Sequence, residues 1–266
     1  TLYDAIPFVD PAMANSRWRA LKNYVLKRSA TYADHVIAIS NFSVAELVTH
    51  YQVPEEKISV IHCGVDEDWL VQPAPDDVDV VLNRYDLERG YLLTVGTLQP
   101  RKNLERLISA HNKLTDIQRK RHPLIVVGKR GWNCDALMEA LQRKIDLGEA
   151  RWLNNVHSRV ELKCLYAGAE AFAFPSTYEG FGLPVVEAFA MGLPVLTSNA
   201  TSLPEVSQGV GLEVDPLSIN ALTEGLEHVL NLPDRVARIS AGKKRAQELT
   251  WARCASETLK VYERLL

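Results

Sequence analysis

The segment AFAFPSTYEGFGLPVVEAFA, residues 171–190, decides how this chain folds. It opens on a short apolar run, Ala171–Phe174, of the length and composition of a buried strand. It closes on the expected helix Pro184–Ala190, where proline suits the first helical turn because its missing N–H costs nothing there. The segment therefore predicts a strand, a glycine-rich loop and a helix in succession.

The same strand–helix order continues on both sides of this segment. Repeated units of this kind predict an α/β fold with a parallel sheet that is covered by helices on both faces. In such sheets ligands bind at the carboxyl ends of the strands, so the loops that follow the strands are the candidate binding loops. The other strands are expected at Tyr91–Val95, Leu124–Val127, Arg151–Leu153 and Pro194–Leu196, and the other helices from Leu104, at Asp135–Asp146 and at Val160–Ala167.

The amino-terminal quarter predicts a second, smaller α/β unit. Strands are expected at His35–Ile39 and Ile58–Ile61, with a helix Ser43–His50 between them that Asn41 caps. The stretch Thr1–Tyr3 has the composition of a strand interior, so we expect a fragment of a longer protein. Residues 66–88 are rich in proline and aspartate and are expected to be a turn-rich connection. From about residue 218 onward the pattern is helical, and the last helix begins near residues 250–251.

The composition is that of a globular protein without an excess of either charge. The chain has 266 residues, 47% of them hydrophobic and 24% charged, and 30 basic against 33 acidic residues give a net charge of −3. By length this is one large domain or about two ordinary ones. A protein that binds nucleic acid usually shows a basic excess, so nucleic acid is not expected as a partner. No apolar run reaches the ~18 residues that a membrane span needs.

The four cysteines lie far apart in the sequence and form no C-x-x-C pair. We therefore expect reduced thiols and a cytoplasmic protein. They are Cys63, Cys134, Cys164 and Cys254.

The loop after the strand Tyr91–Val95 carries two cations beside a helix start. Gly96 permits a ligand to approach the backbone closely, and Arg101 and Lys102 directly precede the helix that begins near Asn103. A helix N-terminus with two cations is suited to a phosphate. The alternative is an ordinary helix start with solvated charges.

The loop from Pro175 to Glu187 is the most specific segment of the chain. Gly180 and Gly182 permit tight turns, and the amides before the helix are suited to an anion or to sugar hydroxyls. Glu187, about one turn into the helix, is placed to accept hydrogen bonds from two vicinal hydroxyls such as those of a ribose. The alternative is a glycine-rich turn with solvated glutamates.

At these residues the chain resembles retaining glycosyltransferases of the GT-B architecture, in particular glycosyltransferase family 4. Glu179 and Glu187 have the E-x7-E spacing of that family. The resemblance spans nearly the whole chain in the family's usual order, through the segments Ala38–Ser40, Cys63–Asp66, Val95–Leu98, Lys102–Asn103, Val126–Gly128, Phe174–Pro184, Leu203–Val206 and Thr250–Tyr262.

The resemblance implies two Rossmann-like domains with a cleft between them. The amino-side acceptor domain is represented only by residues 1–75, a linker spans 76–88, and residues 89–248 form the domain that binds a sugar nucleotide. Residues 249–266 form a helix that crosses back to the amino-side domain.

The resemblance also implies roles for the loop residues. Glu187 is expected to bind the ribose, and Glu179 to act at the donor sugar together with the amides of Phe181 and Gly182. Lys102 matches the lysine that binds the diphosphate. The family often has an arginine directly after the first loop glycine, where this chain has Thr97, so Arg101 is expected to take part instead. Glu179, Lys102 and Arg101 are thus the catalytic candidates, and the expected donor site also includes Gly96, Thr97, Gly180 and Leu183.

The amino-side domain departs from the family pattern. Many members have His-Asp where this chain has Tyr3-Asp4, and we take Tyr3 and Asp4 as candidates that face the sugar or the acceptor. The segment Tyr3–Phe8 is similar to members that build bacterial surface polysaccharides, mannosyltransferases among them. This implies GDP-mannose as donor, a glycan or lipid-linked glycan as acceptor, and transfer with retention by front-face attack. No cofactor is expected, because the sugar nucleotide is itself a substrate.

Two D-x-D strings, Asp66–Asp68 and Asp77–Asp79, fall in or beside the expected connection, so we interpret them as solvated carboxylates and expect no metal.

The stretch Ser16–Ala30 predicts a basic amphipathic helix, with Trp18, Leu21 and Val25 on its apolar side. Such a helix either packs into a core or contacts an anionic membrane, which would place the protein at the inner face of the membrane. Other functions left open are a sugar-nucleotide epimerase or phosphorylase of similar architecture and a non-catalytic partner subunit.

Overall fold

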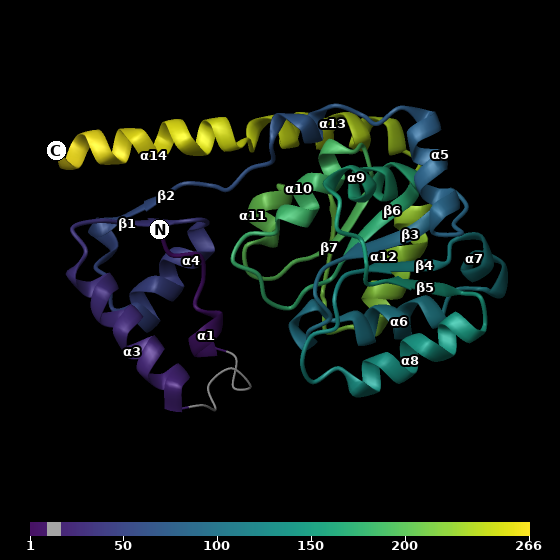
Figure 1. The fold of residues 1–266 in the computed structure, drawn as a ribbon, viewed down its shortest axis with the longest axis horizontal. Coiled ribbons are helices and arrows are strands. Elements are labelled where there is room, and N and C mark those ends of the chain that lie inside the picture. The colour runs from purple at the N-terminus through teal and green to yellow at the C-terminus, as the bar shows by residue number, and fades with distance from the viewer. Residues whose placement is uncertain (10–16) are drawn as a thin grey trace.

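The computed structural model describes residues 1–9 and 17–266, and its larger unit is a six-stranded sheet (Figure 1). The strand order is β5-β4-β3-β6-β7-β8, and every neighbouring pair is parallel. This confirms the predicted parallel α/β sheet, to which the structure adds one strand, β8. The strands are β3 Tyr91–Val95, β4 Leu124–Val127, β5 Ala150–Leu153, β6 Ala169–Phe174, β7 Val195–Ser198 and β8 Leu212–Val214.

Both faces of this sheet are buried under helices, because the central strands carry apolar residues on both sides. In β6, Phe172 and Phe174 belong to one core and Ala171 and Ala173 to the other. The core that contains Phe172 includes residues of α5 Pro75–Arg84, α9 Arg159–Gly168, α10 Leu183–Ala190 and α13 Arg235–Glu248. The opposite core includes residues of α6 Leu104–Asn112, α8 Asp135–Asp146 and α12 Ile219–Leu230.

The strand order reverses between β3 and β6. From β3 the chain proceeds through β4 to β5 at one edge of the sheet, and then from β6 through β7 to β8 at the other edge. Loops that leave neighbouring strands at such a point diverge to opposite sides, and the gap between them is where ligands bind. The two candidate loops of the sequence, after Val95 and after Phe174, leave the two strands that form this switch point.

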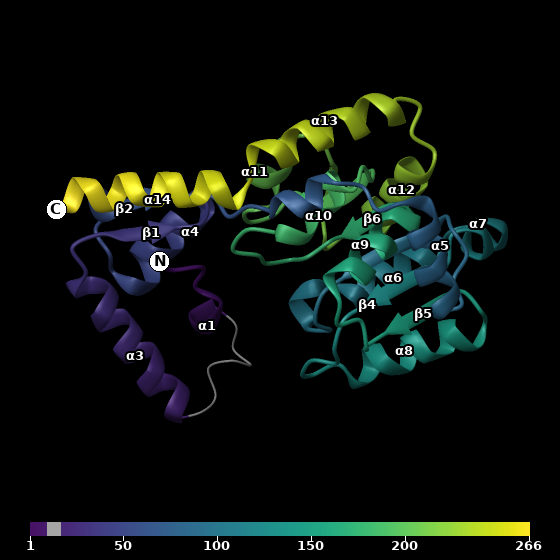
Figure 2. The ribbon, with the colours of Figure 1, turned by 45° about the horizontal axis from the view of Figure 1, so that its top comes forward.

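A smaller parallel pair, β1 Val36–Ala38 with β2 Ile58–Val60, lies beside the large unit (Figures 1 and 2). We call the described residues up to 62 the amino-side part. Its own core includes Ala5, Leu47 and Tyr51. The elements around this pair are α1 Ile6–Val9, α3 Arg17–Tyr32, α4 Asn41–Glu46, the π-helix η1 Leu47–Tyr51 and the 3-10 turn η2 Glu55–Lys57.

The chain passes between the two units at two places that lie side by side. Val65 and Thr250 form a parallel bridge, and Gly64 packs so closely on Thr250 that a Cβ atom there would lie 2.2 Å from the carbonyl carbon of Thr250. Helix α14 Trp251–Leu265 then runs along the small sheet, where Val261 packs with Ile37 and Ile61 (Figure 1). The domain boundaries expected from the sequence stay predictions.

Three local expectations were wrong. Residues 66–88 are not turn-rich: they form the 3-10 helix η3 Glu67–Leu70 and helix α5, whose buried Val78 and Val81 join the main core. The cap of α4 is Ser40 rather than Asn41, because the Ser40 side chain accepts from the amide of Ser43. In place of a strand at residues 1–3, the structure has a single bridge between Leu2 and Ala38.

Helix α3 occupies most of the predicted basic amphipathic stretch, although Ser16 lies outside the described residues. Leu21 and Val25, expected on its apolar side, are 54% and 52% exposed. The described helices include none that is long and apolar enough to cross a membrane. All four cysteines are free thiols.

Candidate active site

The loops that follow β3 and β6 are joined to each other at the switch point. The amide of Thr177 donates to the carbonyl of Arg101 at 2.8 Å, and the Arg101 guanidinium donates back to the carbonyl of Tyr178 at 3.1 Å. The 3-10 turn η4 Pro100–Lys102 ends in the left-handed residue Asn103, whose side-chain amide donates to the carbonyl of Pro175 at 3.0 Å. These bonds fix the two candidate loops in one rigid unit.

Lys102, Arg101 and Glu179 form an ion-pair cluster in this unit. Lys102 Nζ lies 2.6 Å from Glu179 Oε1, and an Arg101 guanidinium nitrogen lies 2.9 Å from Glu179 Oε2. Glu179 is only 8% exposed, and Lys102 Nζ also lies 4.6 Å above the ring of Phe174. Burial lowers the pKa of Lys102, although the neighbouring Glu179 carboxylate raises it in part. Two cations share one carboxylate, so the cluster retains positive charge for an anionic ligand.

Close packing of two loops requires glycine at the end of β3 and at the end of β4. Gly128 has φ +151°, and a Cβ atom on it would lie 2.0 Å from the carbonyl oxygen of Gly96. Gly96 has φ +149°, and a Cβ atom there would meet the Lys102 side chain at 3.3 Å. The predicted binding glycine therefore lies directly beside the predicted diphosphate-binding lysine.

The glycine-rich loop after β6 presents free amides at the start of α10. Gly182 caps the helix with φ +120°, a conformation that favours glycine, and Pro184 occupies the first turn. The amides of Phe181, Gly182 and Leu183 donate to no acceptor within residues 1–9 and 17–266. The loop is held from behind by Ser202, whose hydroxyl lies 2.8 Å from the carbonyl of Phe181.

Glu187 lies one turn into α10 and is partly buried. Tyr166 of α9 donates its hydroxyl to Glu187 Oε2 at 3.0 Å. Burial raises the pKa of Glu187 to about 7, although the bond from Tyr166 and the charge of Arg159 lower it. A carboxylate held so near its titration point gains charge-assisted bonds when a ligand supplies hydroxyl donors.

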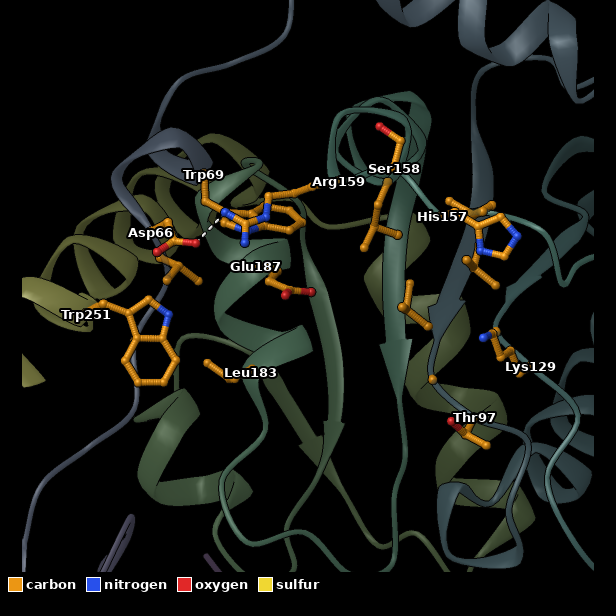
Figure 3. A pocket seen from close by; sticks show the side chains of 18 residues that line it. Asp66, Trp69, Thr97, Lys129, His157, Ser158, Arg159, Leu183, Glu187 and Trp251 are labelled. Carbon is orange, nitrogen blue, oxygen red and sulfur yellow. Dashed lines mark hydrogen bonds and ion pairs between the residues drawn. The ribbon is translucent and has the colours of Figure 1, made fainter. Parts of the chain in front are cut away.

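A cavity of about 500 Å³ opens between these loops. Figure 3 shows Glu187 and Trp251 on one side of it and Thr97, Lys129 and His157 on the other. Of the predicted donor-site residues, the cavity is lined by Gly96, Thr97, Leu183 and Glu187. The cavity lining does not include Glu179, Lys102 or Arg101. The Lys102 side chain packs beside Gly96 of the lining, and it connects the cavity to Glu179 and Arg101.

The same cavity contains Asp66 and Trp69, for which the sequence patterns predict no role. Asp66 and Trp69 come from the segment after β2, and Arg159 begins α9. Asp66 forms an ion pair with Arg159, drawn as a dashed line in Figure 3, and Asp68 lies 3.4 Å from the same guanidinium. The resemblance of the Cys63–Asp66 segment to the family is the feature of the sequence that points to Asp66 as a site residue. The D-x-D pattern, by contrast, predicts only a solvated carboxylate there.

The amino-side candidates Tyr3 and Asp4 lie next to the glycine-rich loop. The Tyr3 side chain is 61% exposed, whereas Asp4 packs against Gly180 and accepts from the amide of Ile6 at 3.0 Å. Burial raises the pKa of Asp4, against the opposing charge of Arg101. Asp4 is therefore the amino-side carboxyl group that is coupled electrostatically to the Arg101–Glu179 cluster.

The two D-x-D strings form ion pairs with different arginines. Asp66 and Asp68 face Arg159, while Asp79 pairs with Arg89 at 2.8 Å. Within the described residues, no group of three or more His, Cys, Asp or Glu side chains is arranged to hold a metal ion. That the reaction needs no metal stays a prediction.

A parallel sheet with its ligand loops at the switch point, facing a second α/β unit, defines the GT-B class of folds. Among solved structures, the chain is similar to HepE from Anabaena in complex with UDP and glucose, with a TM-score of 0.81, 21% identity and coverage of 99% of this chain and 70% of that one. It is also similar to sucrose-phosphate synthase from Thermosynechococcus elongatus, with a TM-score of 0.79, 25% identity and coverage of 100% and 66%.

The chain belongs to the family of glycosyl transferases group 1, whose model matches residues 83–246. A second model, glycosyltransferase family 4, matches residues 7–69. The chain is 36% identical over 245 residues to O-antigen chain mannosyltransferase B of Escherichia coli, covering 90% of this chain and 63% of that protein. It is 30% identical over 252 residues to the MMP alpha-(1->4)-mannosyltransferase of Mycolicibacterium hassiacum, covering 90% and 56%. The chain thus spans less than two thirds of these relatives.

Proposed function

We propose that this protein transfers a mannosyl group from GDP-mannose to a glycan or lipid-linked glycan, with retention of anomeric configuration, in the synthesis of a surface polysaccharide. The observation that carries the proposal is the pairing of Arg101 and Lys102 on the buried Glu179, at the switch point and beside a cavity that contains Glu187. The similarity to mannosyltransferases of O-antigen chains supports the choice of sugar.

The arrangement suits a nucleoside diphosphate that leaves from a sugar. The ribose hydroxyls donate to Glu187, which is ionised near pH 7 once they supply donors. The diphosphate lies toward Lys102 and Arg101, and the donor sugar lies toward the free amides of Phe181 and Gly182. Negative charge that develops on the leaving diphosphate is stabilised by donors already fixed in place, which is the largest contribution to catalysis in sites of this kind.

The proposed route to retention does not use Glu179 as a nucleophile. Its two oxygens are held by Lys102 and Arg101, so it is a poor nucleophile and a good orienting group for the donor sugar. Front-face attack, with the leaving phosphate accepting the proton of the acceptor hydroxyl, then requires no enzyme nucleophile. Asp4 and Tyr3 are placed to contact the sugar or the acceptor from the amino-side part.

The test is a panel of sugar nucleotides measured by thermal shift, followed by product analysis by NMR. A ligand at 100 times its Kd adds about 2.7 kcal/mol to the free energy of unfolding, so GDP-mannose is expected to raise the Tm more than UDP-glucose or ADP-glucose. An α-linked product from the α-linked donor supports retention. Epimerised donor without transfer, or binding without turnover in the longest natural chain that contains these residues, would overturn the proposed activity.

A peripheral membrane contact is part of the proposal. Leu21, Tyr24 and Val25 are each more than half exposed on α3, with Arg28 one turn further along the same face. Such a face suits an anionic bilayer at which a lipid-linked acceptor is held. Co-sedimentation with vesicles of anionic phospholipid, compared with neutral vesicles, is expected to fall when Leu21 and Val25 are both changed to Ser. Equal sedimentation with both vesicle types excludes this contact.

A further inference from the structure

The amino-side part holds the glycine-rich loop through the carbonyl of Gly180. Ser40 Oγ donates to this oxygen at 2.7 Å, and Ser43 Oγ lies 3.3 Å from it. Both serines are fully buried although they come from the amino-side part, Ser40 as the cap of α4 and Ser43 within that helix. A buried carbonyl that loses its donors pays the full cost of desolvation, so the folded protein keeps this contact, in which Ser40 makes the shorter bond and Ser43 the longer one.

The same glycine is enclosed from its other side. A Cβ atom on Gly180 would lie 2.7 Å from the carbonyl oxygen of Tyr3 and 2.9 Å from the Cβ of Asp4. Tyr3 is itself tied to α4, because Ser43 Oγ also lies 3.2 Å from its carbonyl. Tyr3, Asp4, Ser40 and Ser43 together form what we call the Gly180 socket.

The socket acts on the peptide unit between Gly180 and Phe181. A peptide unit is planar and trans, so its C=O and its N–H point in opposite directions. When Ser40 fixes the direction of the Gly180 carbonyl, it also fixes the direction of the Phe181 amide, which has no acceptor within the described residues. That amide is one of the donors assigned above to the donor sugar.

We propose that Ser40 is a positioning residue: it aims the Phe181 amide at the donor through the Gly180 carbonyl, so that the donor loop is complete only while the amino-side part is seated on it. This rests on the proposed function for the identity of the donor. Ser40 is fully buried, so its effect on the donor is transmitted through one peptide unit. The consequence is that the part of the protein which receives the acceptor also sets the geometry of the donor loop.

The interface offers a matched control in Glu205 of α11 Leu203–Ser207. Its carboxylate accepts from the amides of Asn41 and Phe42, and it lies 2.6 Å from His62 Nε2. Burial by itself would raise the pKa of Glu205, but the bonds from His62 and Asn41 lower it overall. Glu205 thus joins the same two units as Ser40 does, without bonding to the peptide unit of Gly180.

The experiment compares Ser40→Ala with Glu205→Gln in the longest natural chain that contains these residues. For Ser40→Ala we expect unchanged affinity for GDP, because the ribose and diphosphate groups stay in place, and a kcat about ten- to one-hundredfold lower. Glu205→Gln weakens contacts between the two units, so we expect it to lower the Tm of the protein. It is expected to change kcat less than about threefold. A kcat for Ser40→Ala close to that of the wild type, or equal losses in the two variants, would overturn the proposal.

Amide hydrogen exchange separates this proposal from the proposed function. Residues 179–183 are expected to exchange faster in Ser40→Ala than in Glu205→Gln, both with GDP present. If the wild type binds GDP but turns over no sugar nucleotide, the proposed activity fails while this exchange difference still tests the role of Ser40. Identical exchange of residues 179–183 in the two variants refutes that role, whatever the activity.

Discussion

Replacing Glu187 by Gln tests both the raised pKa of this side chain and its proposed contact with the ribose. In the folded protein the pKa of this carboxyl group is raised from 4.5 to about 7, because partial burial disfavours its charged form. The unfolded chain therefore releases the proton at lower pH than the folded chain does. The stability that this group contributes is fully present below about pH 4.5 and is lost as the pH rises through about 7. The loss amounts to about 3 kcal/mol, at 1.36 kcal/mol for each unit of pKa shift.

Two results are expected from this replacement. Without ligand, Glu187→Gln has a higher free energy of unfolding than the wild type at pH 8, by as much as about 3 kcal/mol, and the same one at pH 4.5. Ligand affinity changes in the opposite direction: loss of charge-assisted bonds to the ribose costs about 1.5–3 kcal/mol, so GDP binds about ten- to one-hundredfold more weakly. The wild-type affinity for GDP also rises through pH 7, whereas that of the variant does not.

Urea denaturation and titration calorimetry with GDP at pH 6, 7 and 8 provide the measurements. The Gln variant is the control for titration of the ligand phosphates, which contribute equally to both proteins. If the variant binds GDP as tightly as the wild type at pH 8, Glu187 does not hold the ribose. If its stability falls with pH as steeply as that of the wild type, the raised pKa belongs to another group.

Three further predictions concern other parts of the chain. Lys102→Ala is expected to lower kcat more than it lowers affinity for the nucleoside, because charge on the leaving diphosphate is greatest in the transition state; intact turnover with equal losses for nucleoside and diphosphate would contradict this. The enzyme is expected to keep most of its activity in excess EDTA, and loss of turnover that Mg²⁺ or Mn²⁺ restores would show that cations of the protein do not suffice. Glu149→Ala, which leaves Lys144 buried without its 2.9 Å partner, is expected to cost about 3–5 kcal/mol in urea denaturation, and a change below about 1 kcal/mol would show that water compensates the lysine.

The large sheet was predictable because its strands are short apolar runs between amphipathic helices. Helix α8 was predicted with its observed bounds, and strand β3 likewise. Helix α5 was missed because its first turn carries proline and two aspartates, which resemble a turn until the buried Val78 and Val81 are seen packed in the core. Proline and acidic residues are equally typical of a helix start, so the composition of this segment does not distinguish a helix from a turn.

The cluster of Arg101, Lys102 and Glu179 was predictable as a set but not as a contact. Their loops follow β3 and β6, and only the strand order makes these two strands neighbours. Strand order depends on contacts between distant segments, which local sequence patterns do not contain. The same reason explains why Asp66 was assigned to a solvated string, since Arg159 lies 93 residues further along the chain.

The side-by-side passage of the chain at Val65 and Thr250 limits how the two units move. Two covalent connections placed far apart would fix both units in one orientation, and a single connection would leave them free to swivel. Two adjacent connections joined by a backbone bridge leave mainly one rotation, about a line through that bridge. Because Gly64 leaves no room for a side chain against Thr250, a bulkier residue there would displace the pivot itself, and with it every contact that the two units make far from it.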